Sequence, residues 1–264
     1  MLEKVREGFK RAAGGMEFLG LIVSMVINPT ANKTIQLENC ATRLAAEEDL
    51  QRYLRALRSA PATARMLAER YLPRPYRLED LDHYPEGTLG YVYRRHMLEN
   101  GIKADFFTPI DPGDDEHFFR LRLYQTHDVW HVLTGYPISI IGEMSIVGFY
   151  LGHFDRYIGK DAWMPMTFTS LLASTTLLHI ATRRSELVPD YFRGIFDGYT
   201  RGKEALPLFH VRWEHLWDRK LEDLRREFRI RPSNLGQASS VVTRPSIPPA
   251  RPITLRSPAI FPAD

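Results

Sequence analysis

Residues 117–154 decide the fold, and their sequence is HFFRLRLYQTHDVWHVLTGYPISIIGEMSIVGFYLGHF. Apolar residues recur at helical spacing on both sides of Gly135, Tyr136 and Pro137, where the pattern stops. Glycine favours the end of a helix, and proline cannot continue one. The stretch therefore predicts one helix over about 117–134 and a second, apolar helix over about 138–154. Because the break lets the chain reverse, we expect the two helices to lie antiparallel.

Helical spacing also extends outward on both sides of this stretch, and no series of short alternating strands occurs. The further predicted helices cover 47–59, 62–72, a segment ending at Asn100 and Gly101, much of 162–184, and an amphipathic segment with Trp213, Trp217, Leu221, Leu224 and Phe228 on one face. The predicted fold class is all-α, with a single multi-helix domain over residues 1–231.

Residues 232–264 differ from the rest of the chain, because they are rich in proline, serine, alanine and arginine and have no apolar period. Such a segment cannot bury enough apolar surface to offset the entropy lost on ordering. We predict a disordered, Pro-rich C-terminal tail.

The charge of the chain raises the question of nucleic-acid binding, since the formal net charge is +3 and the sequence pI is near 8.9. The tail contributes three arginines against one acid, so the helical body is nearly neutral. A body without a basic block lacks the electrostatic footprint of a nucleic-acid-binding protein. Cys40 is the single cysteine, which excludes an intrachain disulfide and a four-thiolate zinc site.

Two apolar stretches bear on membrane association. Residues 18–27 are too few to span a bilayer but suit a buried or interfacial segment. Residues 162–182 lack charge, yet they contain Pro165, His179 and seven serines or threonines, which suits a buried helix or cavity wall better than a spanning helix. Three glutamates among the N-terminal bases argue against a signal or transit peptide. We expect a bacterial cytoplasmic chain, soluble or peripheral on a membrane.

The strongest chemical signal lies in residues 126–131, THDVWH. Side chains four residues apart on a helix lie over one another, with Cβ atoms about 5–6 Å apart, so His127 and His131 can converge on one metal ion. Asp128 lies about 100° round the helix from His127. This position leaves two possibilities open: Asp128 ligates the metal directly, or it orients a histidine from outside the ligand set.

Glu143 is the only formally charged residue between Asp128 and Asp155. A carboxylate among apolar residues is costly to bury unless a cation or hydrogen bonds meet it. A metal ion held by the preceding helix would meet it across the turn. Two alternatives remain: the histidine pair is structural, or Glu143 belongs to a buried polar network with a tyrosine or an arginine.

Two imidazoles with carboxylates form a mixed nitrogen and oxygen donor set, compatible with zinc, iron(II) or manganese, with zinc preferred. An open coordination position would hold water or a substrate carboxylate. His153 and His179 lie in apolar segments, and we interpret them as core residues.

These residues resemble a known family. The sequence from His127-Asp128 to His131, followed by eleven residues and Glu143, resembles the HDxxH-x11-E motif of the ubiquinone (coenzyme Q) biosynthesis protein COQ-four. The resemblance covers roughly residues 35–231. Similar flanking features are the PEGTLG turn at 85–90, the WHVL continuation at 130–133 and Trp213-Glu214. The Pro-rich tail and the expected lack of a transit peptide depart from the family's usual pattern.

The resemblance implies an all-α fold, peripheral membrane association and homo-oligomers. It implies that His127, Asp128, His131 and Glu143 hold a divalent metal of the zinc type, and that His127, His131 and Glu143 serve catalysis. The implied activity is oxidative decarboxylation of a polyprenylated benzoate precursor of the quinone, in which hydroxyl replaces the ring carboxylate at C1. Partners implied are the quinone precursor, the cytoplasmic face of the inner membrane and other ubiquinone biosynthesis enzymes.

Two other functions remain open at this point. The chain could be a non-catalytic lipid-binding scaffold that organises the biosynthetic enzymes around a structural metal. It could also be an HD-type metal phosphohydrolase, although that class needs further histidine and aspartate ligands that the sequence does not distinguish.

Overall fold

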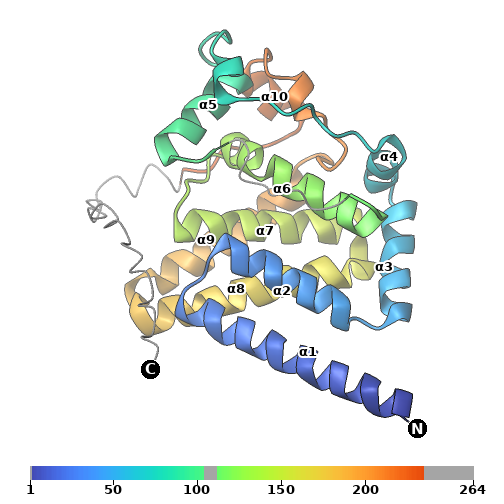
Figure 1. The fold of residues 1–264 in the computed structure, drawn as a ribbon. Coiled ribbons are helices and arrows are strands. Elements are labelled where there is room, and N and C mark those ends of the chain that lie inside the picture. Colours follow the sequence, from blue (N-terminus) through green and yellow to red (C-terminus); the bar gives the residue numbers. More distant parts are fainter. Residues whose placement is uncertain (1, 104–111, 235–264) are drawn as a thin grey trace, which may run out of the picture.

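The chain folds into ten α-helices and four short 3-10 helices over residues 2–103 and 112–234, the part of the chain that this computed structural model describes. The predicted all-α fold is confirmed (Figure 1). The α-helices are α1 (Leu2–Ile27), α2 (Ala31–Leu44), α3 (Glu47–Ser59), α4 (Pro61–Glu69), α5 (Leu89–Asn100), α6 (Asp115–Thr134), α7 (Ile140–Tyr157), α8 (Trp163–Arg183), α9 (Val188–Glu204) and α10 (Leu221–Glu227). The 3-10 helices are η1 (Leu78–Leu81), η2 (Gly159–Asp161), η3 (Ser185–Leu187) and η4 (Trp213–His215).

Helices α6 and α7 form the antiparallel pair expected on either side of the Gly135 break. Asp114 caps the start of α6, with its Oδ1 accepting the backbone N–H of His117 at 2.9 Å. Gly135 ends α6 in the left-handed conformation, with φ 74°, and Ser139 caps the start of α7. Between them, Trp130 of α6 stacks on Tyr150 of α7 with ring centroids 4.6 Å apart. This pair carries the motif and its partner carboxylate.

Helices α7 and α9 pack at backbone contact through glycines on both partners. A Cβ added at Gly148 would lie 2.3 Å from the carbonyl oxygen of Ile195, and one added at Gly198 would lie 2.0 Å from that of Ser145. Gly152 and Gly202 make equally close approaches to the opposite helix. No side chain fits at such distances, so these glycines serve helix packing.

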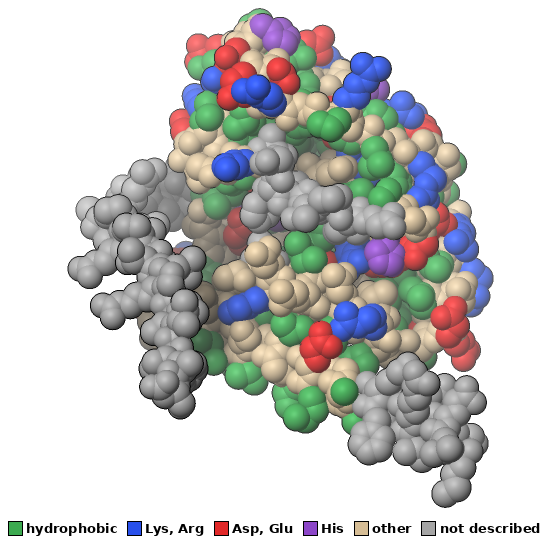
Figure 2. Space-filling view, viewed as in Figure 1, with side chains coloured by type: hydrophobic (Ala, Val, Ile, Leu, Met, Phe, Trp, Pro, Cys, Tyr) green, Lys and Arg blue, Asp and Glu red, His purple; other side chains and the backbone are tan. Residues whose placement is uncertain are grey.

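Apolar side chains also reach the surface. Met16, Leu19, Val23 and Ile27 lie three or four residues apart on α1 and are more than half exposed. Figure 2 shows apolar side chains at the lower edge of one face of the molecule, along α1. Among the described residues, none of the helices is long and apolar enough to cross a membrane.

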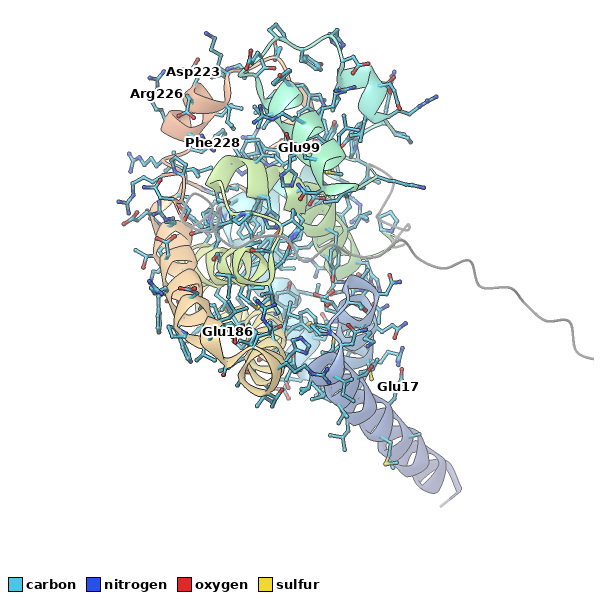
Figure 3. The ribbon with its side chains drawn as sticks, turned by 90° about the vertical axis from the view of Figure 1, so that its left-hand side faces the viewer. Glu17, Glu99, Glu186, Asp223, Arg226 and Phe228 are labelled. Atoms are coloured by element: carbon cyan, nitrogen blue, oxygen red, sulfur yellow. The ribbon has the colours of Figure 1, made fainter. Side chains whose placement is uncertain are left out.

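The predicted amphipathic helix through Trp213 and Phe228 is wrong as a single element. The structure divides it into η4 and α10, and the chain between them forms a turn at 217–219 before Lys220 pairs with Thr88 in an isolated bridge. There the carbonyls of Trp217 and Arg219 accept hydrogen bonds from Gly90 and Leu89 at 2.9 and 2.8 Å. These backbone hydrogen bonds to the start of α5 take the place of the hydrogen bonds that a continuous helix would form within itself. Asp223 and Arg226 still project from α10 as an exposed ion pair, while Phe228 packs on Trp213 (Figure 3).

Helix α4 also ends earlier than predicted, because Arg70 adopts a left-handed conformation, with φ 40°, directly after Glu69. The predicted tail begins with residues that pack on the body. Ser233 is buried, and its backbone N–H donates to the carbonyl of Thr134 at 2.7 Å. Residues 235–264, which make up the rest of the predicted disordered tail, lie outside the described part of the chain.

Candidate metal centre

His127 and His131 lie one turn apart on α6 and face the first turn of α7, where Glu143 is located. The side chain of His131 is fully buried, whereas those of His127 and Glu143 are 28% and 35% exposed. The group therefore lies at the edge of the core and opens to solvent on the side of His127 and Glu143.

The three side chains present their donor atoms to one point. The two Nε2 atoms are 3.2 Å apart, and the carboxylate oxygens of Glu143 lie 3.3 Å from Nε2 of His127 and 3.4 Å from Nε2 of His131. In a tetrahedral site with bonds of about 2.0–2.1 Å, neighbouring donors are about 3.3–3.4 Å apart. The separations in this group match that value, so the three residues fit a zinc-type ion with a further coordination position left for another ligand.

The orientation of His131 is fixed by the break between the helices. Its Nδ1–H donates to the carbonyl oxygen of Tyr136 at 2.9 Å, which leaves the lone pair of Nε2 directed at the site. Tyr136 is held in turn, because its hydroxyl donates to Asp197 of α9 at 2.6 Å. The turn between α6 and α7 thus contributes the carbonyl of Tyr136 to the site.

Charge is concentrated on Glu143. Burial acts to raise the pKa of this carboxyl, but the hydrogen bonds and charges of His127 and His131 together lower it to well below its usual range. For His127, burial lowers the pKa while the hydrogen bond and charge of Glu143 raise it, and the net shift is upward. The N-terminal end of α7 also favours the negative charge. Glu143 therefore stays ionised and supplies the negative charge that a cation at this site would meet.

An aromatic wall closes the side of the site toward the core. The ring of Tyr150 lies parallel to that of His127, with centroids 6.2 Å apart, and stacks on Trp130. Burial strongly raises the pKa of Tyr150, so its phenol stays neutral.

Asp128 is placed differently from the other three predicted metal residues. Its side chain is buried, but it is not part of the group whose donor atoms lie within 4.8 Å of one another. Burial is the main cause that raises the pKa of Tyr76 and of Tyr93 on α5, and the charge of Asp128 adds to it; the same charge also raises the pKa of His127.

His96 of α5 is a neighbour that sequence reasoning missed. Its ring lies 6.0 Å from that of His131, and its buried Nε2 has no hydrogen-bond partner among the described residues. Burial and the proximity of His131 lower its pKa. No fixed spacing relates His96 to the motif, so only the packing of α5 on α6 could reveal it.

His153 behaves as a core residue. His153 donates from Nδ1 to Gly202 at 2.9 Å and accepts the N–H of Leu208 at Nε2, and burial lowers its pKa to about 4. This confirms the interpretation of His153 as a core residue. A second group of possible ligand atoms, on Asp114, Glu116 and His117, lies at the start of α6.

Comparisons with known proteins place these features in a family. Residues 15–234 match the family described as "Coenzyme Q (ubiquinone) biosynthesis protein Coq4". A mitochondrial COQ4 homolog of Anopheles gambiae, named a ubiquinone biosynthesis protein, is 25% identical over 80% of this chain and 71% of its own length. The Aspergillus niger protein of the same description is 27% identical, over 85% of this chain and 74% of its own.

One solved structure shares the fold. A Nostoc punctiforme protein named for ubiquinone biosynthesis superposes with a TM-score of 0.67, covering 81% of this chain and 95% of the other at 24% identity. At that identity the likeness supports the helical architecture alone. The sequence relatives and the matching family carry the functional comparison.

Proposed function

We propose a function for this chain from one premise: it belongs to the coenzyme Q (ubiquinone) biosynthesis protein Coq4 family, and its role is in ubiquinone biosynthesis. The proposed reaction is metal-dependent replacement of the C1 carboxylate of a polyprenylated benzoate precursor by hydroxyl. The observation that carries this proposal is the convergence of His127, His131 and Glu143 at metal-ligand spacing.

The reaction balances as follows. A benzoic acid, dioxygen, two electrons and two protons give a phenol, carbon dioxide and water, so the bond from C1 to the carboxyl carbon breaks and a bond from C1 to oxygen forms. Dioxygen is the oxidant, and a two-electron donor reduces its second oxygen atom. A divalent ion, zinc by preference, would supply Lewis-acid chemistry and a docking point for the ring carboxylate.

The chain's own residues have distinct roles in this proposal. His127, His131 and Glu143 would hold the ion, with Nε2 of His131 directed by the carbonyl of Tyr136. Glu143 contributes the negative charge that sets how strongly the ion attracts a carboxylate. Tyr150 and Trp130 exclude water on the inner side, and the exposed edges of His127 and Glu143 leave the ring an approach.

The precursor carries a long isoprenoid tail, so the proposal includes a membrane surface. The exposed apolar side chains of α1 support it, because such a stripe can enter the headgroup region of a bilayer. We propose peripheral binding to the cytoplasmic face of a bacterial inner membrane, as a homo-oligomer, next to other ubiquinone biosynthesis enzymes.

The two alternatives fare differently. The phosphohydrolase is disfavoured, because Asp128 of the histidine-aspartate pair lies outside the group of donor atoms. A lipid-binding scaffold with a structural metal uses the same site and the same apolar surface. Turnover separates the scaffold from the enzyme.

The test is complementation of a bacterial strain that lacks its own copy of this protein. Glu143→Gln keeps the shape of the side chain but removes a negative charge from the site. We expect normal expression, accumulation of the C1-carboxylated polyprenyl precursor and loss of ubiquinone, measured by mass spectrometry of lipid extracts. Glu186→Gln, the same change at an exposed ion pair with Arg184, is the matched control and should restore ubiquinone. Normal ubiquinone with Glu143→Gln would contradict the enzyme and favour the scaffold.

A further inference from the structure

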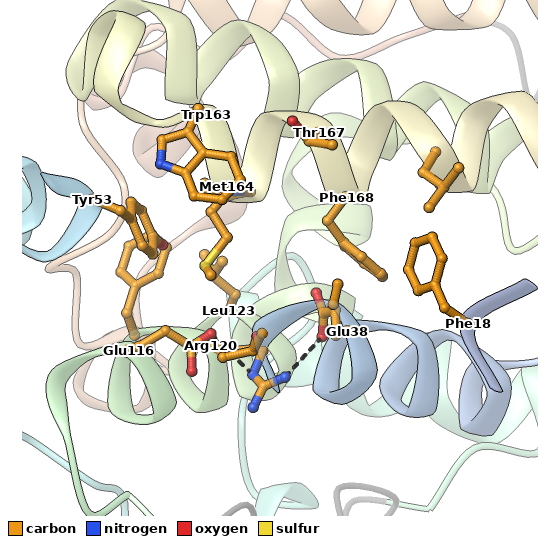
Figure 4. A pocket seen from close by; sticks show the side chains of 15 residues that line it. Phe18, Glu38, Tyr53, Glu116, Arg120, Leu123, Trp163, Met164, Thr167 and Phe168 are labelled. Atoms are coloured by element: carbon orange, nitrogen blue, oxygen red, sulfur yellow. Dashed lines mark ion pairs between the residues drawn. The ribbon is translucent and has the colours of Figure 1, made fainter. Parts of the chain in front are cut away.

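A separate pocket lies between α1, α2, α6 and α8 and measures about 90 Å³ (Figure 4). Its walls are apolar and include Phe18, Phe119, Phe168 and Leu171. Phe18, Phe168 and Leu171 are partly exposed, so the pocket is open on their side, while Phe119 is buried. The helix α6 contributes to both this pocket and the metal centre, but the pocket uses its first half.

The floor of the pocket is charged. Arg120 and Glu116 are one helical turn apart on α6 and are only 6% and 7% exposed, and Glu38 approaches from α2. Arg120 donates from Nη1 to Asn39 at 2.8 Å. It also forms ion pairs with Glu38 and Glu116 at 3.8 and 3.5 Å (Figure 4).

Two polar atoms of this floor lack a hydrogen bond. Within the described residues, neither Nε of Arg120 nor Oε2 of Glu116 has a hydrogen-bond partner. Nδ1 of His117 lies 3.5 Å from Oε2 of Glu116. A buried donor and a buried acceptor left unsatisfied are costly, so a group that meets both would be stabilised there.

The charge balance of the floor selects among such groups. One arginine faces two carboxyls, and burial raises the pKa of Glu38 to about 7 and also raises that of Glu116. Tyr124 donates to Glu38. The floor is therefore close to neutral or slightly negative near pH 7, which disfavours a carboxylate or a phosphate.

We propose that this pocket binds an uncharged, single-ring molecule with one hydroxyl and an apolar tail, which is an alkylphenol. A hydroxyl both donates and accepts, so it can donate to Oε2 of Glu116 while it accepts from Nε of Arg120. A carboxylate can only accept and would face the carboxylate of Glu116. The ring lies beside Phe119 and the tail leaves between Phe18 and Phe168. A cavity of about 150 Å³ accommodates benzene, so a pocket of about 90 Å³ that is open on one side admits the head of such a ring with the remainder in its mouth.

The test compares 4-butylphenol with 4-butylbenzoate, which differ only at the head. Calorimetric titration of the full chain at neutral pH gives the affinities. The part of the tryptophan fluorescence change that is lost in Trp163→Phe reports the location, because Trp163 is the one of the four tryptophans that lines the pocket. We expect saturable binding of the phenol at one site per chain and binding of the benzoate weaker by about tenfold or more. Glu116→Gln supplies an amide N–H in place of a carboxylate oxygen, so this preference should shrink.

Two variants with a bulky ring fix the place of binding. Ala41 lines the pocket and is partly exposed, so Ala41→Phe should fill the mouth and abolish phenol binding. Ser170 is exposed on α8 and does not line the pocket, so Ser170→Phe should leave it unchanged. Melting curves of both variants serve as the check that they fold.

His131→Ala separates this pocket from the metal centre, and phenol binding should survive it. Loss of phenol binding in His131→Ala, equal binding of the benzoate, or undiminished phenol binding in Ala41→Phe would each overturn the proposal. The absence of saturable phenol binding would also overturn it and would mean that ordered water satisfies the polar atoms of the floor. None of these results bears on the reaction proposed at the metal centre.

Discussion

At the scale of single residues, the motif predicted a group of possible metal ligands, and the packing determined which side chains converge. Spacing alone placed His127 and His131 on one helix face, and the lone charge of Glu143 indicated its partner. Asp128 could not be assigned, because a residue next to a ligand on a helix points to another face. His96 could not be found at all, since its proximity to His131 depends on how α5 packs on α6.

Metal binding and pH are linked at His127, because a protonated imidazole cannot donate its lone pair to an ion. Glu143 raises the pKa of His127 above its ordinary value. Protonated His127 therefore stabilises the metal-free protein at pH values below that ordinary pKa, and this stabilisation is lost as the pH rises through the raised pKa. Protons therefore compete with zinc more strongly at about pH 6 than at about pH 8. We expect the rise in melting temperature on adding zinc to be larger at the higher pH.

His131→Ala serves as the control for this measurement, because removing one ligand should leave no zinc-dependent rise at either pH. A zinc-dependent rise that is equal at the two pH values would show that His127 does not lose a proton on binding.

At the scale of the elements, helices with local signals were predicted well. Glu47–Ser59 matches the predicted helix at both ends, and α5 ends at the predicted Asn100-Gly101 signal. The prediction of one helix over 213–228 was wrong for a physical reason. Its apolar residues do face the core, but the start of α5 offers backbone partners to 217–219 that are far away in the sequence. Periodicity identified the buried face and could not identify those partners.

The contact between α7 and α9 is the element pair most sensitive to substitution. Gly198→Ala would place a methyl group 2.0 Å from the carbonyl oxygen of Ser145, and backbone on both sides leaves little room to relax. We expect the free energy of unfolding to fall by about 1–3 kcal/mol or more, as measured by urea denaturation.

Gly15→Ala is the matched control for that substitution. Gly15 is exposed on α1, and a Cβ there meets nothing within 4 Å. Alanine favours a helix by about 1 kcal/mol over glycine, so this variant should be as stable as the parent or slightly more so. Equal stability of Gly198→Ala and the parent would refute the close approach of α7 and α9.

At the scale of the whole molecule, the metal centre and the phenol pocket lie on successive parts of α6. The helix presents Glu116 and Arg120 to the pocket, and then His127 and His131 to the metal, on a scaffold of α2, α7 and α8. One site is suited to a carboxylate that meets a cation, and the other to an uncharged hydroxyl. Ser233, two residues beyond the boundary predicted after Arg231, packs on the body, because its N–H donates to the carbonyl of Thr134 at the end of α6.

The most direct measurement of the central claim is the metal content of the purified full-length chain. Elemental analysis should find about one divalent ion per chain. His127→Ala and His131→Ala should each lose it, because removing one ligand from a small set takes away a large share of the affinity. His83→Ala, the same change at an exposed histidine outside the site, should retain the ion. Full occupancy in either His127→Ala or His131→Ala would show that the ion lies elsewhere and would contradict the account.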